Sequence, residues 1–133
     1  MAALRSSIAV ITGVATGAAF LGLMELTVRL IPEASPWNLT ISSILTSLSS
    51  IVPGFTAGVV AVRRGFLIGA AAGVLTSILF STYANLIAPR SVIDLPPTDV
   101  LPAELTWAAL AVVVGGISGI AGAAVRREGW NAF

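Results

Sequence analysis

Four long stretches without a charged residue dominate the sequence and restrict what it can fold into. They run from Ser6 to Met24, from Ala34 to Val62, from Gly65 to Pro89 and from Leu105 to Val125. A helix needs about 20 apolar residues to cross the hydrocarbon layer of a membrane, and each stretch supplies that length. The stretches are continuous and do not alternate with a period of two, so strands of a membrane barrel are not expected. We predict an all-α integral membrane protein in which residues 1–133 form one domain of four transmembrane helices, near 6–31, 36–62, 66–88 and 102–125, with an outer loop over 89–101.

The composition agrees with a lipid environment and removes several kinds of chemistry. Hydrophobic residues make up 56% of the chain and charged residues 10%, whereas a soluble domain has about 25% charged residues. Cysteine and histidine are absent and all seven basic residues are arginine, which leaves no thiolate or imidazole metal ligand and no Schiff-base lysine. The sequence also lacks the GxSxG, Walker A and HExxH motifs. We therefore expect no catalysis, no metal site and no cofactor, and a net charge of +1 gives no support for binding nucleic acid.

The charged residues predict how the chain is oriented in the membrane. Four spans place five arginines on one side, namely Arg5, Arg63, Arg64, Arg126 and Arg127, and the remaining two, Arg29 and Arg90, on the other. The acids sort the opposite way: only Glu128 joins the five arginines, and the other side holds Glu25, Glu33, Asp94, Asp99 and Glu104. The formal charges are then +5−1 = +4 and +2−5 = −3. Because cytoplasmic loops carry the excess of arginine, we expect both termini in the cytoplasm, with the chain in a bacterial inner membrane.

Small residues recur every four positions along each predicted helix. These ridges consist of Ala9, Gly13 and Gly17; of Ser42, Thr46, Ser50, Gly54 and Gly58; of Gly69, Gly73, Ser77 and Ser81; and of Gly115, Gly119 and Ala123. Lipid provides no hydrophobic drive between helices, so close backbone approach through small side chains supplies the packing energy. We expect a small-xxx-small packed bundle with its contacts at the glycines of these ridges: Gly13, Gly17, Gly54, Gly58, Gly69, Gly73, Gly115 and Gly119.

The second predicted helix is rich in hydroxyl groups and contains a proline, in the segment "NLTISSILTSLSSIVPG". Pro53 has no backbone N–H, which removes the usual helical partner of the Ser49 carbonyl and favours a kink. Kinked, hydroxyl-rich helices occur at transport sites. Ser49, Ser50 and Pro53 are therefore candidates for contact with a solute, while packing inside the protein is the simpler explanation of the same residues.

Glu25 and Arg29 form the other candidate site. They are four residues apart with the acid first, which is the favourable order for an ion pair on one helix face. Glu25 follows Arg5 by 20 residues, or about 30 Å along a helix, so the pair is expected near the outer boundary of the membrane. It is either a structural ion pair or part of a proton- or cation-linked site.

These features leave two classes of function open. In the first, the protein is a structural or accessory subunit, surrounded by membrane lipids, that assembles with copies of itself or with a larger membrane complex. In the second, it is a small oligomeric transporter or channel that uses the hydroxyl-rich helix and Glu25.

Overall fold

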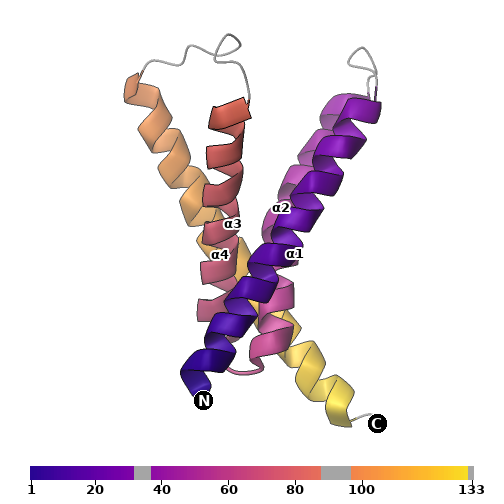
Figure 1. The fold of residues 1–133 in the computed structure, drawn as a ribbon, viewed down its shortest axis with the longest axis vertical. Helices are drawn as coiled ribbons and strands as arrows, with labels where there is room; N and C mark the ends of the chain where they lie inside the picture. The colour runs from indigo at the N-terminus through magenta and orange to yellow at the C-terminus, as the bar shows by residue number, and fades with distance from the viewer. Residues whose placement is uncertain (32–36, 88–96, 132–133) are drawn as a thin grey trace.

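The computed structural model describes residues 1–31, 37–87 and 97–131. At some helical positions it gives only the backbone, mainly in the first half of the second helix and at the two ends of the fourth. The chain forms four helices, which are α1 (Ala2–Leu30), α2 (Trp37–Ala61), α3 (Gly65–Ile87) and α4 (Pro97–Asn131) (Figure 1). The predicted all-α class is thereby confirmed.

The fourth helix extends beyond the predicted segment at both ends. It begins at Pro97 and ends at Asn131, whereas the sequence predicted 102–125. The predicted outer loop over 89–101 is therefore helical from Pro97 onward. Proline is accommodated at the first helical position because the N–H it lacks would have no partner within the helix. Arg90 and Asp94 lie outside the described residues, as do the side chains of Asp99 and Glu104.

Three helices contain segments that are long and apolar enough to cross a membrane. These segments are Ala2–Thr27 in α1, Gly65–Tyr83 in α3 and Leu105–Glu128 in α4. In α2, the apolar segment found among the described residues is Leu48–Ala61, which is shorter than a bilayer crossing. The fourth span remains a prediction.

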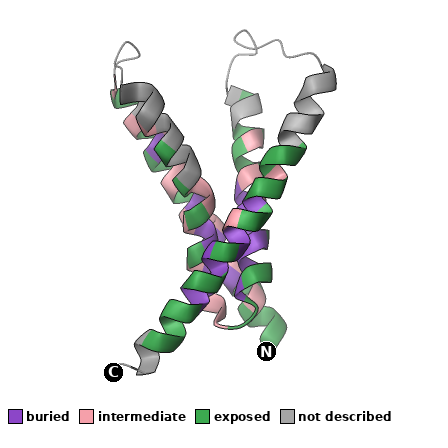
Figure 2. Cartoon of the chain, turned by 180° about the vertical axis from the view of Figure 1, so that it is seen from behind, coloured by how far each residue is buried: buried purple, intermediate pink, exposed green. Residues whose placement is uncertain are grey.

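The helices are arranged around a central pair. α2 and α3 contact each other, and both α1 and α4 contact this pair, whereas the described parts of α1 and α4 do not contact one another. α1 crosses one face of the pair and α4 crosses the other, so that the four helices meet at a waist (Figure 1). Buried residues gather at this crossing (Figure 2). Away from the termini, α1 and α2 diverge from α3 and α4 (Figure 1).

On the α1 side of the waist, glycine allows the backbone to lie close to both central helices. A Cβ placed on Gly13 would lie 2.7 Å from the Cβ of Ala57 in α2 and 2.9 Å from the Cβ of Ala72 in α3. A Cβ on Gly17 would lie 2.7 Å from Oγ1 of Thr76. A side chain larger than hydrogen at either position would therefore separate α1 from the central pair.

On the α4 side, the contacts are between backbones. A Cβ on Gly115 would lie 2.7 Å from the carbonyl oxygen of Gly69, and a Cβ on Gly119 would lie 2.8 Å from the Cα of Gly69. The same holds from α2, where a Cβ on Gly54 or on Gly58 would lie 2.8 Å from the Cα of Gly115 or of Gly119, respectively. All eight glycines that the sequence singles out are buried, and they lie at Gly13, Gly17, Gly54, Gly58, Gly69, Gly73, Gly115 and Gly119.

Candidate functional site: a groove between α1 and α3

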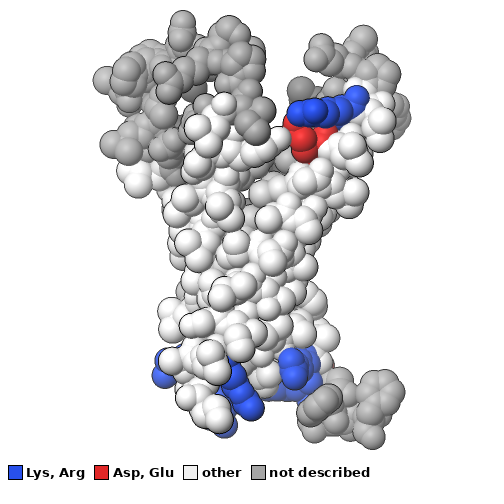
Figure 3. Space-filling view, viewed as in Figure 1, with Lys and Arg blue, Asp and Glu red and all other residues white. Residues whose placement is uncertain are grey.

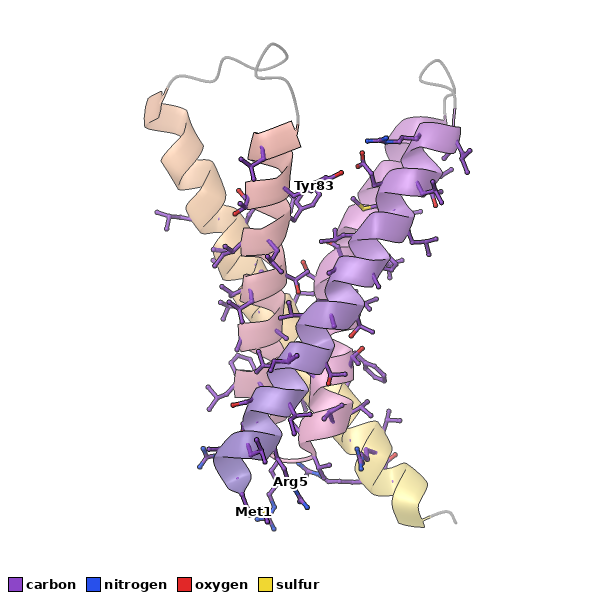
Figure 4. The ribbon with its side chains drawn as sticks, in the orientation of Figure 1. Met1, Arg5 and Tyr83 are labelled. Carbon is purple, nitrogen blue, oxygen red and sulfur yellow. The ribbon has the colours of Figure 1, made fainter. Side chains whose placement is uncertain are left out.

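A groove of about 500 Å³ lies between the halves of α1 and α3 that are away from the chain termini. Its lining consists of Ala18, Leu21, Gly22, Glu25, Leu26 and Arg29 from α1 and of Leu79, Phe80 and Tyr83 from α3. Tyr83 extends from α3 toward α1 (Figure 4). The volume is within the range of about 300–1,000 Å³ that is typical of ligand sites, and the lining is mostly apolar.

The groove begins where the contact between α1 and α3 ends. At the waist, Gly17 of α1 faces Thr76 of α3. The Thr76 hydroxyl is buried and donates a hydrogen bond of 2.8 Å to the carbonyl of Ala72, so it is satisfied within its own helix. Beyond this level the facing side chains are large, with Leu21 on α1 and Phe80 on α3. The facing residues thus change from small at the waist to large beyond it, at the place where α1 and α3 diverge.

An ion pair between Glu25 and Arg29 lies in the groove. Nε and Nη2 of Arg29 each lie 3.0 Å from Oε1 of Glu25, and the side chains of Arg29 and Glu25 are 65% and 41% exposed. Such an exposed pair on one helix contributes only about 0.3–0.5 kcal/mol to stability. Figure 3 shows the two opposite charges side by side, at the end of the molecule away from the termini. The groove therefore holds two formal charges that cancel.

Ser49, Ser50 and Pro53 of α2 are not among the described residues that line this groove. Ser49 and Ser50 are half-buried and Pro53 is buried. The Cβ of Pro53 lies 3.1 Å from the Cβ position of Gly17, so the proline packs against α1. α2 continues as a helix through Pro53. The two candidate transport features are thus in different places among the described residues: Glu25 is in the groove, and Pro53 is in the waist.

Of the residues that line the groove, the sequence analysis singled out Glu25 and Arg29 as candidate site residues and did not single out Gly22. Every other glycine with described surroundings has a neighbouring atom within 4 Å of its Cβ position, whereas Gly22 has none. Glycine in a helix costs about 1 kcal/mol relative to alanine, and the described part of the chain gives no packing reason for it here. Ala18 and Gly22 form a second small-xxx-small pair on α1. The sequence contains this signal. Gly22 follows Gly17 by five residues, which is about 140° around the helix, so Gly22 lies on a different face of α1 from the ridge of Gly13 and Gly17.

At the opposite end of the molecule, two arginines join α4 to α2. Nη1 of Arg126 donates a hydrogen bond of 3.0 Å to the carbonyl of Val59. Nε and Nη2 of Arg127 donate bonds of 3.1 and 2.9 Å to the carbonyl of Val62. Carbonyls at the end of a helix lack hydrogen-bond donors within the helix. The side chains of Arg126 and Arg127 act as the donors here. The sequence predicted Arg126 and Arg127 only as markers of topology.

The apolar helices and their arrangement define a helical membrane protein. No known family model matches the chain, and neither a curated protein nor a solved structure matches it.

Proposed function

We propose that the protein is a non-catalytic membrane subunit that assembles with copies of itself, with the groove between α1 and α3 receiving a helix of a second copy. The observation that carries this proposal is Gly22, whose Cβ position has no neighbour within 4 Å beside a largely apolar groove of about 500 Å³. A glycine kept in a helix without an internal contact is accounted for by close approach of a backbone from outside the chain.

The chemistry of the groove favours a transmembrane helix as its occupant. Helix association in lipid depends on close packing at small residues, and the inner ridge of α1 already packs at the waist through Gly13 and Gly17. The pair Ala18 and Gly22 supplies a second, unused surface of the same kind. The Glu25–Arg29 pair has no net charge, so a helix can pass beside it without an uncompensated charge being enclosed.

A second copy of the chain provides such a helix without requiring another protein. In a two-fold dimer the same surface is used by both partners, so the Ala18–Gly22 surface of one α1 would face the α1 of its partner. Each copy would then place its apolar outer half of α1 in the groove of the other.

The substitution Gly22→Leu tests this interface. Because the Cβ position of Gly22 is open, leucine is expected to leave the helix bundle folded while it fills part of the groove. We expect Gly22→Leu to lose most of the energy transfer between differently labelled copies in lipid vesicles. The chain has no cysteine, so a single cysteine at the exposed position Glu128 carries the label.

The matched control is Ala19→Leu. Ala19 is exposed on the same helix and does not line the groove, so this variant is expected to associate like the unsubstituted protein. Energy transfer that persists at full strength in Gly22→Leu, or that is lost equally in both variants, would contradict a helix in the groove.

A transporter or channel is the second candidate, and the place of Glu25 favours it. Glu25 lines the groove together with Tyr83 of α3, which extends toward α1 (Figure 4). A cation or proton flux across reconstituted vesicles that is abolished by Glu25→Gln would support this alternative. If flux is absent in both proteins, assembly remains the better explanation of the groove.

A further inference from the structure

The ion pair in the groove lies on the same face of α1 as the small residues beside it. Ala18, Gly22, Glu25 and Arg29 follow one another at spacings of four, three and four residues. This alternation is the one by which two helices in a coiled coil face each other. All four residues line the groove, and Ala18, Gly22 and Arg29 are exposed while Glu25 is half-buried. The open face of α1 therefore continues from two small residues into two opposite charges.

A two-fold dimer through this face brings two copies of each charge together. The uneven distribution of arginine orients every copy in the same way across the membrane, so the two α1 helices run parallel. In a parallel pair of helices, residues of the same number face one another. Glu25 of one copy would then lie opposite the partner's Glu25, and Arg29 opposite the partner's Arg29. Each of these pairs alone would repel.

The direction of the Arg29 side chain removes this repulsion. Side chains on a helix point back toward its N-terminus, and Arg29 reaches back by one turn, so that its Nε and Nη2 each lie 3.0 Å from Oε1 of Glu25. The partner's Glu25 would lie at this same level. A guanidinium group has more N–H donors than one carboxylate oxygen can accept, so each arginine can bond to both glutamates.

We propose that Glu25 and Arg29 of two copies form a network of four charges across the dimer interface. The network selects a parallel second copy of this chain, in register, as the occupant of the groove. This inference rests on the proposed self-assembly. The formal charge of the network is +2−2 = 0, and a slip of one copy by a helical turn would leave one arginine and one glutamate outside it. Polar side chains on the contact face of paired helices fix their register and choice of partner in this way.

Charge reversal tests the network with the energy-transfer assay and the cysteine label at Glu128. Glu25→Arg gives each copy two arginines on this face, and Arg29→Glu gives each copy two glutamates. Either variant on its own would bring four like charges together, so we expect its self-association to be at least about tenfold weaker than that of the unsubstituted protein. A mixture of the two variants can form pairs with two charges of each sign. We expect this mixture to recover the energy transfer of the unsubstituted protein.

Two further variants serve as controls. Leu30→Arg adds a positive charge at the same end of α1, at a side chain that is 77% exposed and does not line the groove, and it is expected to associate like the unsubstituted protein. The double variant Glu25→Arg with Arg29→Glu keeps both charges in exchanged positions and is expected to associate as well. Glu25 and Arg29 are at the protein surface, so all variants are expected to fold, and circular dichroism checks that they do.

The outcomes separate this inference from the assembly on which it rests. If unsubstituted copies show no energy transfer, both are overturned. If they associate in a manner that depends on Gly22, but either charge-reversed variant associates with itself at full strength, the network is overturned and the assembly stands. Failure of the mixed variants to recover association, with each variant folded, would also overturn the network.

Discussion

Replacing Gly119 by alanine is expected to destabilise the helix bundle by about 1–3 kcal/mol, the usual range for overpacking. A Cβ at this position would lie 2.8 Å from the Cα of Gly69 and would also contact the carbonyl oxygen of Gly65. Gly119 is also close to α2, because a Cβ placed on Gly58 would lie 2.8 Å from the Cα of Gly119. The neighbours of a Cβ on Gly119 are backbone atoms of α3, which cannot turn aside as a flexible side chain can. Thermal unfolding in detergent, followed by circular dichroism, measures the effect.

Gly22→Ala is the matched comparison for this substitution. It adds the same methyl group to a helical glycine, but into open space. It is therefore expected to leave the bundle unchanged or to stabilise it by up to about 1 kcal/mol through the higher helix propensity of alanine. Equal melting temperatures for Gly119→Ala and Gly22→Ala would show that the waist does not depend on the close backbone contact.

Val62→Gly is expected to be more stable than Val60→Gly by about 2 kcal/mol. Val62 has a φ of 61°, a left-handed conformation that costs a residue with a Cβ about 1–2 kcal/mol. Glycine would relieve this cost, whereas glycine at Val60, inside α2, would add about 0.5–1 kcal/mol. Both valine side chains are half-buried. Val60 also packs against the buried cluster that contains Ala57, so the loss of its side chain adds to the cost of Val60→Gly and acts in the same direction as the backbone effect.

The same thermal unfolding experiment measures both valine variants. The backbone carbonyl oxygen of Val62 accepts the hydrogen bonds that Arg127 donates, so these bonds are retained when the Val62 side chain is removed. Equal stability of the two variants would contradict the strained turn.

The sequence predicted the helices well because the signals involved are local. Uncharged runs and flanking arginines depend only on neighbouring residues, and they located α1 and α3 to within a few residues. The far end of α4 was less predictable. Arg126 and Arg127 suggested a helix end at a membrane boundary, whereas the helix continues to Asn131. The two side chains donate hydrogen bonds to the carbonyls of Val59 in α2 and of Val62, which directly follows α2.

The groove was harder to predict because it depends on how the helices cross. Glu25 was identified by its charge, and the sequence analysis grouped it with Pro53 because a membrane-embedded charge and a kinked, hydroxyl-rich helix can each belong to a transport site. Their separation in the structure follows from the waist, where Pro53 packs against Gly17 of α1. Gly22 was missed because a four-residue spacing shows only which residues share one face of a helix. Which face stays uncovered depends on how the other helices pack, and the spacing does not show this.

The most direct test of assembly between copies is the native mass of the protein, purified in mild detergent. Each chain has a mass of 13.5 kDa. If a helix of a second copy occupies the groove, the particle contains at least two copies, and Gly22→Leu shifts it to one. A particle that contains a single copy of the unsubstituted chain, alone or bound to another protein, would contradict assembly through the groove.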